Sequence, residues 1–285
     1  MGKQTTATSW IAAVVVVLAV VATGVYLARQ AMHAGKSPGT TAALPKSAPA
    51  VGSTARQPIQ HPIGMAQTDV AVASTAALPA LGESDTAVAA GLAALVGGDR
   101  LHGVLVPRRI IARIVATIDA LPRHDGLGVF MLPAHTPQGA FATTVVDGET
   151  TMSAQNAARY APYMALVEHA DPQALVAWYV HAYPLFQAAY QELGYPHGYF
   201  NDRLLVVIDD LLATPVLAHP AALQVSKTWY TYADPALESL STGQKLLLRV
   251  GPANAARIKA RLREIRARLV GQMPPAAGSA AGASK

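Results

Sequence analysis

The stretch DPQALVAWYVHAYPLFQAAYQEL, residues 171–193, decides the fold of this chain. Two apolar stripes run along it at helical spacing. The first consists of Leu175, Trp178, Ala182, Leu185 and Ala189, and the second of Tyr179, Tyr183, Phe186 and Tyr190. A helix that is apolar over so much of its circumference normally lies at the centre of a core. We therefore expect a helical domain built around this segment.

The ends of this segment carry helix punctuation. Asp171 and Pro172 are typical of a helix start, and Gly194 is typical of the residue just past a helix end. Pro184 lies in the middle and has no backbone donor. We therefore expect a kink or a break near Tyr183.

Further helices are expected on both sides of the segment. Each starts at a capping residue or a proline and continues with apolar residues at helical spacing. The expected ranges are 84–96, 107–121, 153–168, 201–213, 241–250 and 252–270, with Ser84, Pro107, Ser153, Asn201, Ser241 and Pro252 at their starts. Ser241 and Gln244 have the spacing of a capping box.

Strand signals are few. Residues 141–152 contain two β-prone runs around an Asp-Gly turn, which predicts a β-hairpin. Residues 223–232 form a second β-prone run. Two or three short strands cannot organise a parallel sheet, so the predicted class is mainly α, a helical domain with a small β-hairpin addition.

Composition limits the classes of function. The chain is 52% hydrophobic and 14% charged and has no cysteine, which excludes a wholly disordered protein, disulfide frameworks, thiol nucleophiles and cysteine-bound metals. The net charge is +5, but residues 78–272 hold 16 basic and 16 acidic residues. A neutral domain gives no support for a nucleic-acid partner. The chain also lacks the usual phosphate-loop, dinucleotide, nucleophile-elbow and His-Glu-x-x-His patterns, so we predict no cofactor and no metal.

An uncharged run, WIAAVVVVLAVVATGVYL, occupies residues 10–27. It is long enough for a membrane span, and Trp10 and Tyr26 stand near its ends, where amphipathic rings are favoured. A cleaved signal peptide is the alternative, but Val20-Val21-Ala22 is a poor cleavage site and lies inside the apolar run. We predict a transmembrane helix over 10–28, whose partner is the lipid bilayer.

The expected organisation follows from this span. Residues 1–9 form a cytoplasmic tail, 29–77 a disordered linker rich in Pro, Ala, Ser and Thr, 78–272 the folded helical domain and 273–285 a disordered tail. The short amino-terminal tail and the absence of cysteine favour a folded domain outside the cytoplasm. The prediction is a single-pass protein of the bacterial cytoplasmic (inner) membrane with a periplasmic, extracytoplasmic domain.

Several runs are similar to a known family. They are LPALGESD at 78–85, NAARY at 156–160, YPLFQAAYQELGYPHGYFND at 183–202, VIDDLLATP at 207–215, ADPALESLSTGQK at 233–245 and RVGPAN at 249–254. Together they resemble a bacterial family named for a domain of unknown function, number 3014, over about 78–269. The resemblance implies a membrane-anchored protein with an extracytoplasmic domain, and it supplies no reaction and no catalytic residue.

The loop between two expected helices carries the candidate binding residues. They are Tyr195, His197, Tyr199 and Phe200. Gly194, Pro196 and Gly198 interrupt this loop, yet its rings are large for a spacer. We predict a tethered module that binds an envelope protein or the cell wall through them. The alternative is that the rings cover the helix ends as part of the core.

A second hypothesis is catalytic. Asp202 and Asp209 are seven residues apart on one expected helix, with His197 just upstream, as in a hydrolase or a metal-dependent enzyme. The structural alternative places Asp202 at a helix start and pairs Asp209 and the adjacent Asp210 with an arginine. The candidates for that arginine are Arg159, Arg203 and Arg249. Binding is favoured over catalysis.

Overall fold

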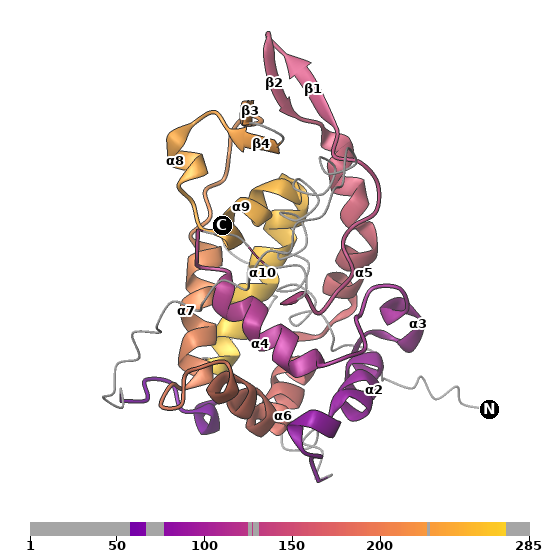
Figure 1. Cartoon of the computed structure of the whole chain (residues 1–285), viewed down its shortest axis with the longest axis vertical. Helices are drawn as coiled ribbons and strands as arrows, with labels where there is room; N and C mark the ends of the chain where they lie inside the picture. Colours follow the sequence, from indigo (N-terminus) through magenta and orange to yellow (C-terminus); the bar gives the residue numbers. More distant parts are fainter. Residues whose placement is uncertain (1–57, 67–76, 125–126, 128–130, 227–228, 272–285) are drawn as a thin grey trace, which may run out of the picture.

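A computed structural model describes residues 58–66, 77–124, 127, 131–226 and 229–271. These residues form a mainly helical body with two small antiparallel hairpins at one end (Figure 1). None of the helices in these ranges is both long and apolar enough to cross a bilayer. The tail predicted at 1–9, the membrane span predicted at 10–28 and the carboxyl-terminal tail predicted at 273–285 lie outside the described residues.

The elements agree with the predicted class. The α-helices are α2 (Asp85–Val96), α3 (Gly98–Leu101), α4 (Ile110–Ala120), α5 (Ala161–His169), α6 (Pro172–Glu192), α7 (Phe200–Leu212), α8 (Pro235–Glu238), α9 (Thr242–Arg249) and α10 (Pro252–Leu269). The 3-10 turns are η1 (Ile63–Met65), η3 (Leu81–Glu83) and η5 (Ala154–Tyr160). The strands are β1 (Thr143–Val146), β2 (Glu149–Met152), β3 (Leu223–Ser226) and β4 (Trp229–Tyr232).

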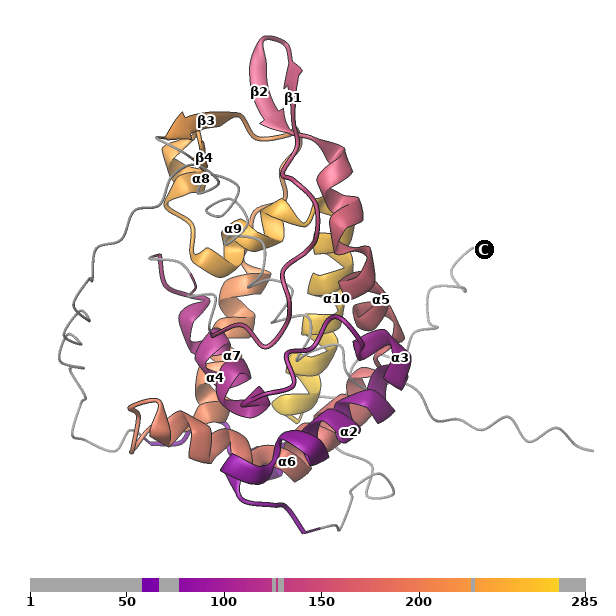
Figure 2. The ribbon, with the colours of Figure 1, turned by 45° about the vertical axis from the view of Figure 1, so that its right-hand side comes forward.

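Helix α6 lies in the core, as its apolar stripes predict. It packs against α4, α7 and α10, at the end of the molecule opposite to the hairpins (Figure 2). Phe186 is 1% exposed, and its ring centroid lies 5.7 Å from that of Phe200 at the start of α7. Tyr179 packs edge-on against Phe186 at 5.1 Å. These rings join α6 to α7 and fix the angle between them. We call this junction, with Tyr199, Asn201 and Asp202 at the start of α7, the corner.

The predicted break in α6 is wrong, because the helix continues through Pro184. The residues on either side, Tyr183, Leu185 and Phe186, are buried. Burial of large side chains on both flanks offsets the loss of one backbone hydrogen bond.

The helix starts confirm some predicted caps and correct others. Asp171 caps α6, and Ser241 and Gln244 form the predicted capping box of α9. Ser84 does not cap α2, because its hydroxyl donates to the carbonyl of Leu81. The expected helix after Ser153 is divided into η5 and α5.

Helix α4 begins at Ile110, three residues after the predicted start at Pro107. The carboxylate of Asp85 accepts hydrogen bonds from the amides of Arg109 at 2.6 Å and Ile110 at 2.8 Å. Arg109 has a φ of 50°, which ends the extended chain that enters the helix. The cap is supplied by another helix, so the local sequence does not reveal where α4 starts.

The β content is two hairpins, where the sequence predicted one hairpin and one β-prone run. Asp147 and Gly148 both have positive φ in the tight turn between β1 and β2. The run 223–232 folds into the antiparallel pair β3 and β4. An isolated bridge between Thr151 and Ala222 links the hairpins.

Candidate functional site

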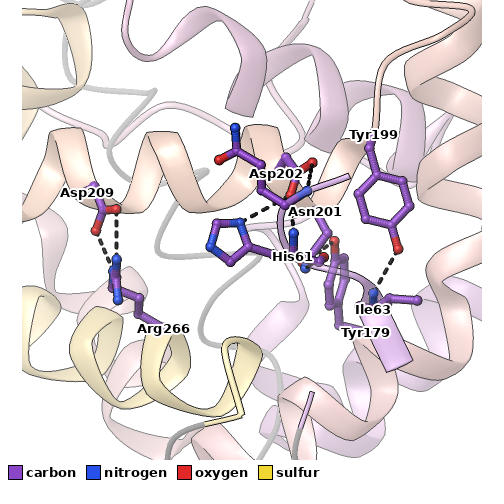
Figure 3. Close-up of polar contacts among 9 residues, drawn as sticks. His61, Ile63, Tyr179, Tyr199, Asn201, Asp202, Asp209 and Arg266 are labelled. Atoms are coloured by element: carbon purple, nitrogen blue, oxygen red, sulfur yellow. Dashed lines mark hydrogen bonds and ion pairs between the residues drawn. The ribbon is translucent and has the colours of Figure 1, made fainter. Parts of the chain in front are cut away.

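A short segment, residues 58–66, crosses the amino end of α7 (Figure 3). We call it the strap. It falls inside the range 29–77 that the sequence predicted as a disordered linker, and for these nine residues that prediction does not hold. The reason is a set of polar side chains on α7 and before it, which bind the main chain of the strap.

Asp202 makes the largest contribution to this contact. Its carboxylate accepts hydrogen bonds from the amides of Gln60 at 3.0 Å and His61 at 2.7 Å. Nδ1 of His61 lies 3.2 Å from the same carboxylate. Hydrogen bonds to an ionised acceptor are stronger than those between neutral groups. One side chain therefore fixes two successive amides of the strap.

Asn201 and Tyr199 hold the next positions of the strap. Nδ2 of Asn201 donates to the carbonyl oxygen of His61 at 2.8 Å, and the amide of Ile63 donates to the hydroxyl of Tyr199 at 2.7 Å. Pro62, between these two positions, has no amide hydrogen to satisfy. The chain bends at Gln60 and His61, which turns their two amides toward one carboxylate, and the three side chains match the donors and acceptor that this bend exposes.

The binding side chains are themselves held in place. Asn201 is fully buried, and its Oδ1 accepts from the hydroxyl of Tyr179 at 3.3 Å. Burial raises the pKa of Tyr179 well above its ordinary value, so the phenol stays protonated and donates. Gln187 of α6 donates to the carbonyl of Gly198 at 2.8 Å and accepts from the amide of Phe200 at 3.0 Å. The corner is therefore shaped by α6 and α7.

A second polar cluster supports the loop between α6 and α7. Asp119 of α4 is 2% exposed and accepts from Nε of Arg203 at 2.9 Å and from the hydroxyl of Tyr195 at 3.2 Å. Arg123 forms an ion pair with the same carboxylate. The ring of Tyr195 stacks on that of Tyr190 at 4.6 Å, and burial, with a smaller contribution from the charge of Asp119, raises the pKa of Tyr190 to about 12. The cluster ties the loop to α4.

The structure separates the four predicted binding residues. Phe200 is fully buried against Phe186, so it cannot contact a partner and that assignment is wrong. His197 is exposed on the loop, and Tyr195 is committed to the Asp119 cluster. Tyr199 contacts the strap directly. Sequence reasoning missed Asn201 as a contact residue, because it assigned this residue to a helix cap.

The two candidate carboxylates serve different contacts (Figure 3). Asp202 faces the strap, whereas Asp209 forms a two-bond ion pair with Arg266 of α10 at 2.5 and 3.0 Å. The predicted arginine partners were wrong: Arg203 pairs with Asp119. In the described ranges no group of three or more His, Cys, Asp or Glu side chains could hold a metal ion.

These features define the class as a mainly helical domain with a corner that holds the short strap of the same chain through main-chain hydrogen bonds. The chain belongs to the family described as "Protein of unknown function (DUF3014)", whose model matches residues 110–266. This match confirms the resemblance found in the sequence. No curated protein and no solved structure matched the chain. The matched range includes the corner and begins after the strap.

The Asp119 cluster predicts a difference between two carboxylate substitutions. We expect Asp119→Asn to lower the free energy of unfolding by about 1.5–3 kcal/mol, because it weakens hydrogen bonds to a buried charge. Asp209→Asn removes an exposed ion pair, so the expected loss is below about 1 kcal/mol. Urea unfolding of both variants of the full chain measures the difference. Equal losses would show that the cluster does not stabilise the loop.

The phenol contact predicts a local effect on the strap. Tyr199→Phe keeps the ring beside Tyr183 but removes the acceptor for the amide of Ile63. We expect faster hydrogen exchange in residues 58–66 and little change in melting temperature. Tyr195→Phe is the matched control, since it removes a hydroxyl that does not contact the strap. Unchanged exchange in Tyr199→Phe would rule out this contact.

Proposed function

We propose that this chain is a membrane-anchored bacterial envelope protein whose extracytoplasmic domain binds a short segment of another protein at the corner of α6 and α7. The observation that carries the proposal is the bound strap. Asp202, Asn201 and Tyr199 hold it through three amide hydrogens and one carbonyl. Recognition through main-chain groups is a common way to bind a peptide.

The pattern of groups favours a protein over a cell-wall glycan as the partner. The carboxylate of Asp202 accepts from the main-chain amides of two successive residues, Gln60 and His61. The side-chain amide of Asn201 donates to the main-chain carbonyl of His61. A polypeptide backbone supplies this set of groups where it bends, as it does at Gln60 and His61. A glycan chain offers hydroxyl groups at other spacings, so the corner would not match its repeat.

The catalytic alternative has less support from the geometry. A hydrolase or a metal-dependent enzyme needs its acid, base or ligand groups to converge on one reacting site. Asp202 contacts the strap, Asp209 pairs with Arg266 on α10, and His197 is exposed on the loop. Each of the three groups thus faces a different environment, which favours binding as the function.

The membrane part of the proposal rests on the sequence. Residues 10–27 are uncharged and long enough to span a bilayer as a helix. The chain has no cysteine, which suits an oxidising compartment. We infer a single span over 10–28 in the cytoplasmic membrane, with the folded domain on the periplasmic side. The chain between the span and the domain limits how far away its partner can be.

Reporter fusions test the topology. A reporter that is active only outside the cytoplasm, fused after Lys285, should be active, and a reporter active only in the cytoplasm should be inactive there. The same two reporters fused to a chain lacking residues 1–28 give the control, since removal of the span should reverse both results. A cytoplasmic signal from the full chain would contradict the proposed location.

Crosslinking in cells tests the binding site. Val206 is exposed and lies one helical turn after Asp202 on the same face of α7. We expect a photoreactive residue at position 206 to give a crosslink to an envelope protein, and Asp202→Ala to abolish it. A photoreactive residue at Val216, which is exposed beyond α7, is the control position. Crosslinks that persist in Asp202→Ala would place the partner elsewhere.

A further inference from the structure

The strap is held by polar contacts and buries little apolar surface. Ile59 is 52% exposed and Met65 is 60% exposed. Only Ile63 and Ala66 pack against the core, and both are partly exposed. A segment with so few buried apolar contacts belongs to the part of a protein that opens locally without global unfolding. The strap can therefore leave the corner while the core stays intact.

The corner does not depend on the strap for its shape. Asn201 is bound by Tyr179, and Gln187 fixes the main chain at Gly198 and Phe200. Phe200 is fully buried. These contacts come from α6, α7 and the loop between them, and none of them involves the strap. A site whose groups are already oriented loses little conformational freedom when a ligand binds, so the corner is pre-organised to receive a chain segment.

The contacts define which segment fits. The carboxylate requires two successive amides, the second of which belongs to His61 and brings its imidazole to the same carboxylate. The next residue, Pro62, has φ −57° and ψ 134°, an extended conformation that proline adopts readily. The amide of Ile63 then donates to the hydroxyl of Tyr199, and its side chain packs against the core. The matching sequence is a histidine, a proline and an aliphatic residue in order.

We propose that the corner is an exchangeable binding site for peptides of the type x-His-Pro-aliphatic that bend at x and His as the strap does, that the strap is its intramolecular ligand, and that a segment of a partner protein takes the place of the strap. This inference deepens the proposed function and rests on it for the partner. It adds the class of peptide that the corner binds. It also makes the strap a competitor, whose affinity for the corner sets the affinity that a partner needs.

The strap competes with any free peptide for the corner, and its effective concentration can be estimated to an order of magnitude. Ten residues, 67–76, connect the strap to the rest of the domain. A ligand that belongs to the same chain as its site competes at an effective concentration that, for a short linker, is on the order of millimolar. A free peptide with the same contacts must therefore compete against that concentration. Cutting the connection removes the advantage of the strap.

The experiment uses the full chain in detergent micelles, with a protease recognition sequence inserted between Gln67 and Ala76. The probe is a fluorescent peptide with the sequence of residues 58–66, PIQHPIGMA. We expect the apparent Kd for the peptide to fall at least tenfold after cleavage and dilution, as measured by fluorescence anisotropy. The uncleaved chain is the reference.

Matched controls test the contacts without relying on one variant. A peptide with alanine in place of the residues equivalent to His61 and Ile63 should bind at least tenfold more weakly to the unaltered cleaved chain. Asp202→Asn in the cleaved chain should weaken binding similarly, whereas Asp209→Asn, on the same helix, should not. A thermal melt of each variant checks that it is folded.

Three outcomes would overturn the inference. The first is an absence of peptide binding to the folded, cleaved chain, and the second is equal binding of the alanine peptide. The third is co-purification of two differently tagged uncleaved chains that depends on Asp202, which would make a second copy the partner. The reporter fusions remain independent: a cytoplasmic signal refutes the proposed location but not peptide exchange, and failed exchange leaves the location standing.

Discussion

The stacking of Phe186 on Phe200 is the contact on which the binding corner depends. It places the start of α7 against the middle of α6, and both rings are almost completely shielded from solvent. Phe200 is buried and is the first residue of α7. Its position therefore fixes the directions in which the side chains of the next residues point. Asn201 then faces inward to Tyr179, and Asp202 reaches the strap.

Two further carboxylates, those of Asp119 and Asp209, hold the helices around this corner in place. Asp119 anchors the loop before α7 through Tyr195 and holds α7 itself through Arg203. Asp209 joins α7 to α10 through Arg266. Each of these carboxylates connects two helices. Asp119 and Asp209 thus join helices, whereas Asp202 faces the strap.

Local patterns predicted much of the fold. The apolar stripes of residues 171–193, the Asp-Gly turn and the capping box at Ser241 each contain their whole signal within a few residues, and each was found as predicted. The site was harder to predict, since its contacts join distant parts of the chain. Gln60 and Asp202 are 142 residues apart, and Asp119 and Arg203 are 84 apart. No spacing rule relates such pairs. Of the residues that hold the strap, the sequence therefore indicates Tyr199 and Asp202 as candidate site residues but gives no partner for either.

The position of the strap also determines where the domain would feel a mechanical load. A pull on the chain before Pro58 would reach the helical body first at Asp202 and Tyr199, and would pass from there into α7 and α6. The bonds of the strap would have to break before the tension reached Leu81 and α2. The domain would therefore yield to stretching in two stages, with the core protected during the first.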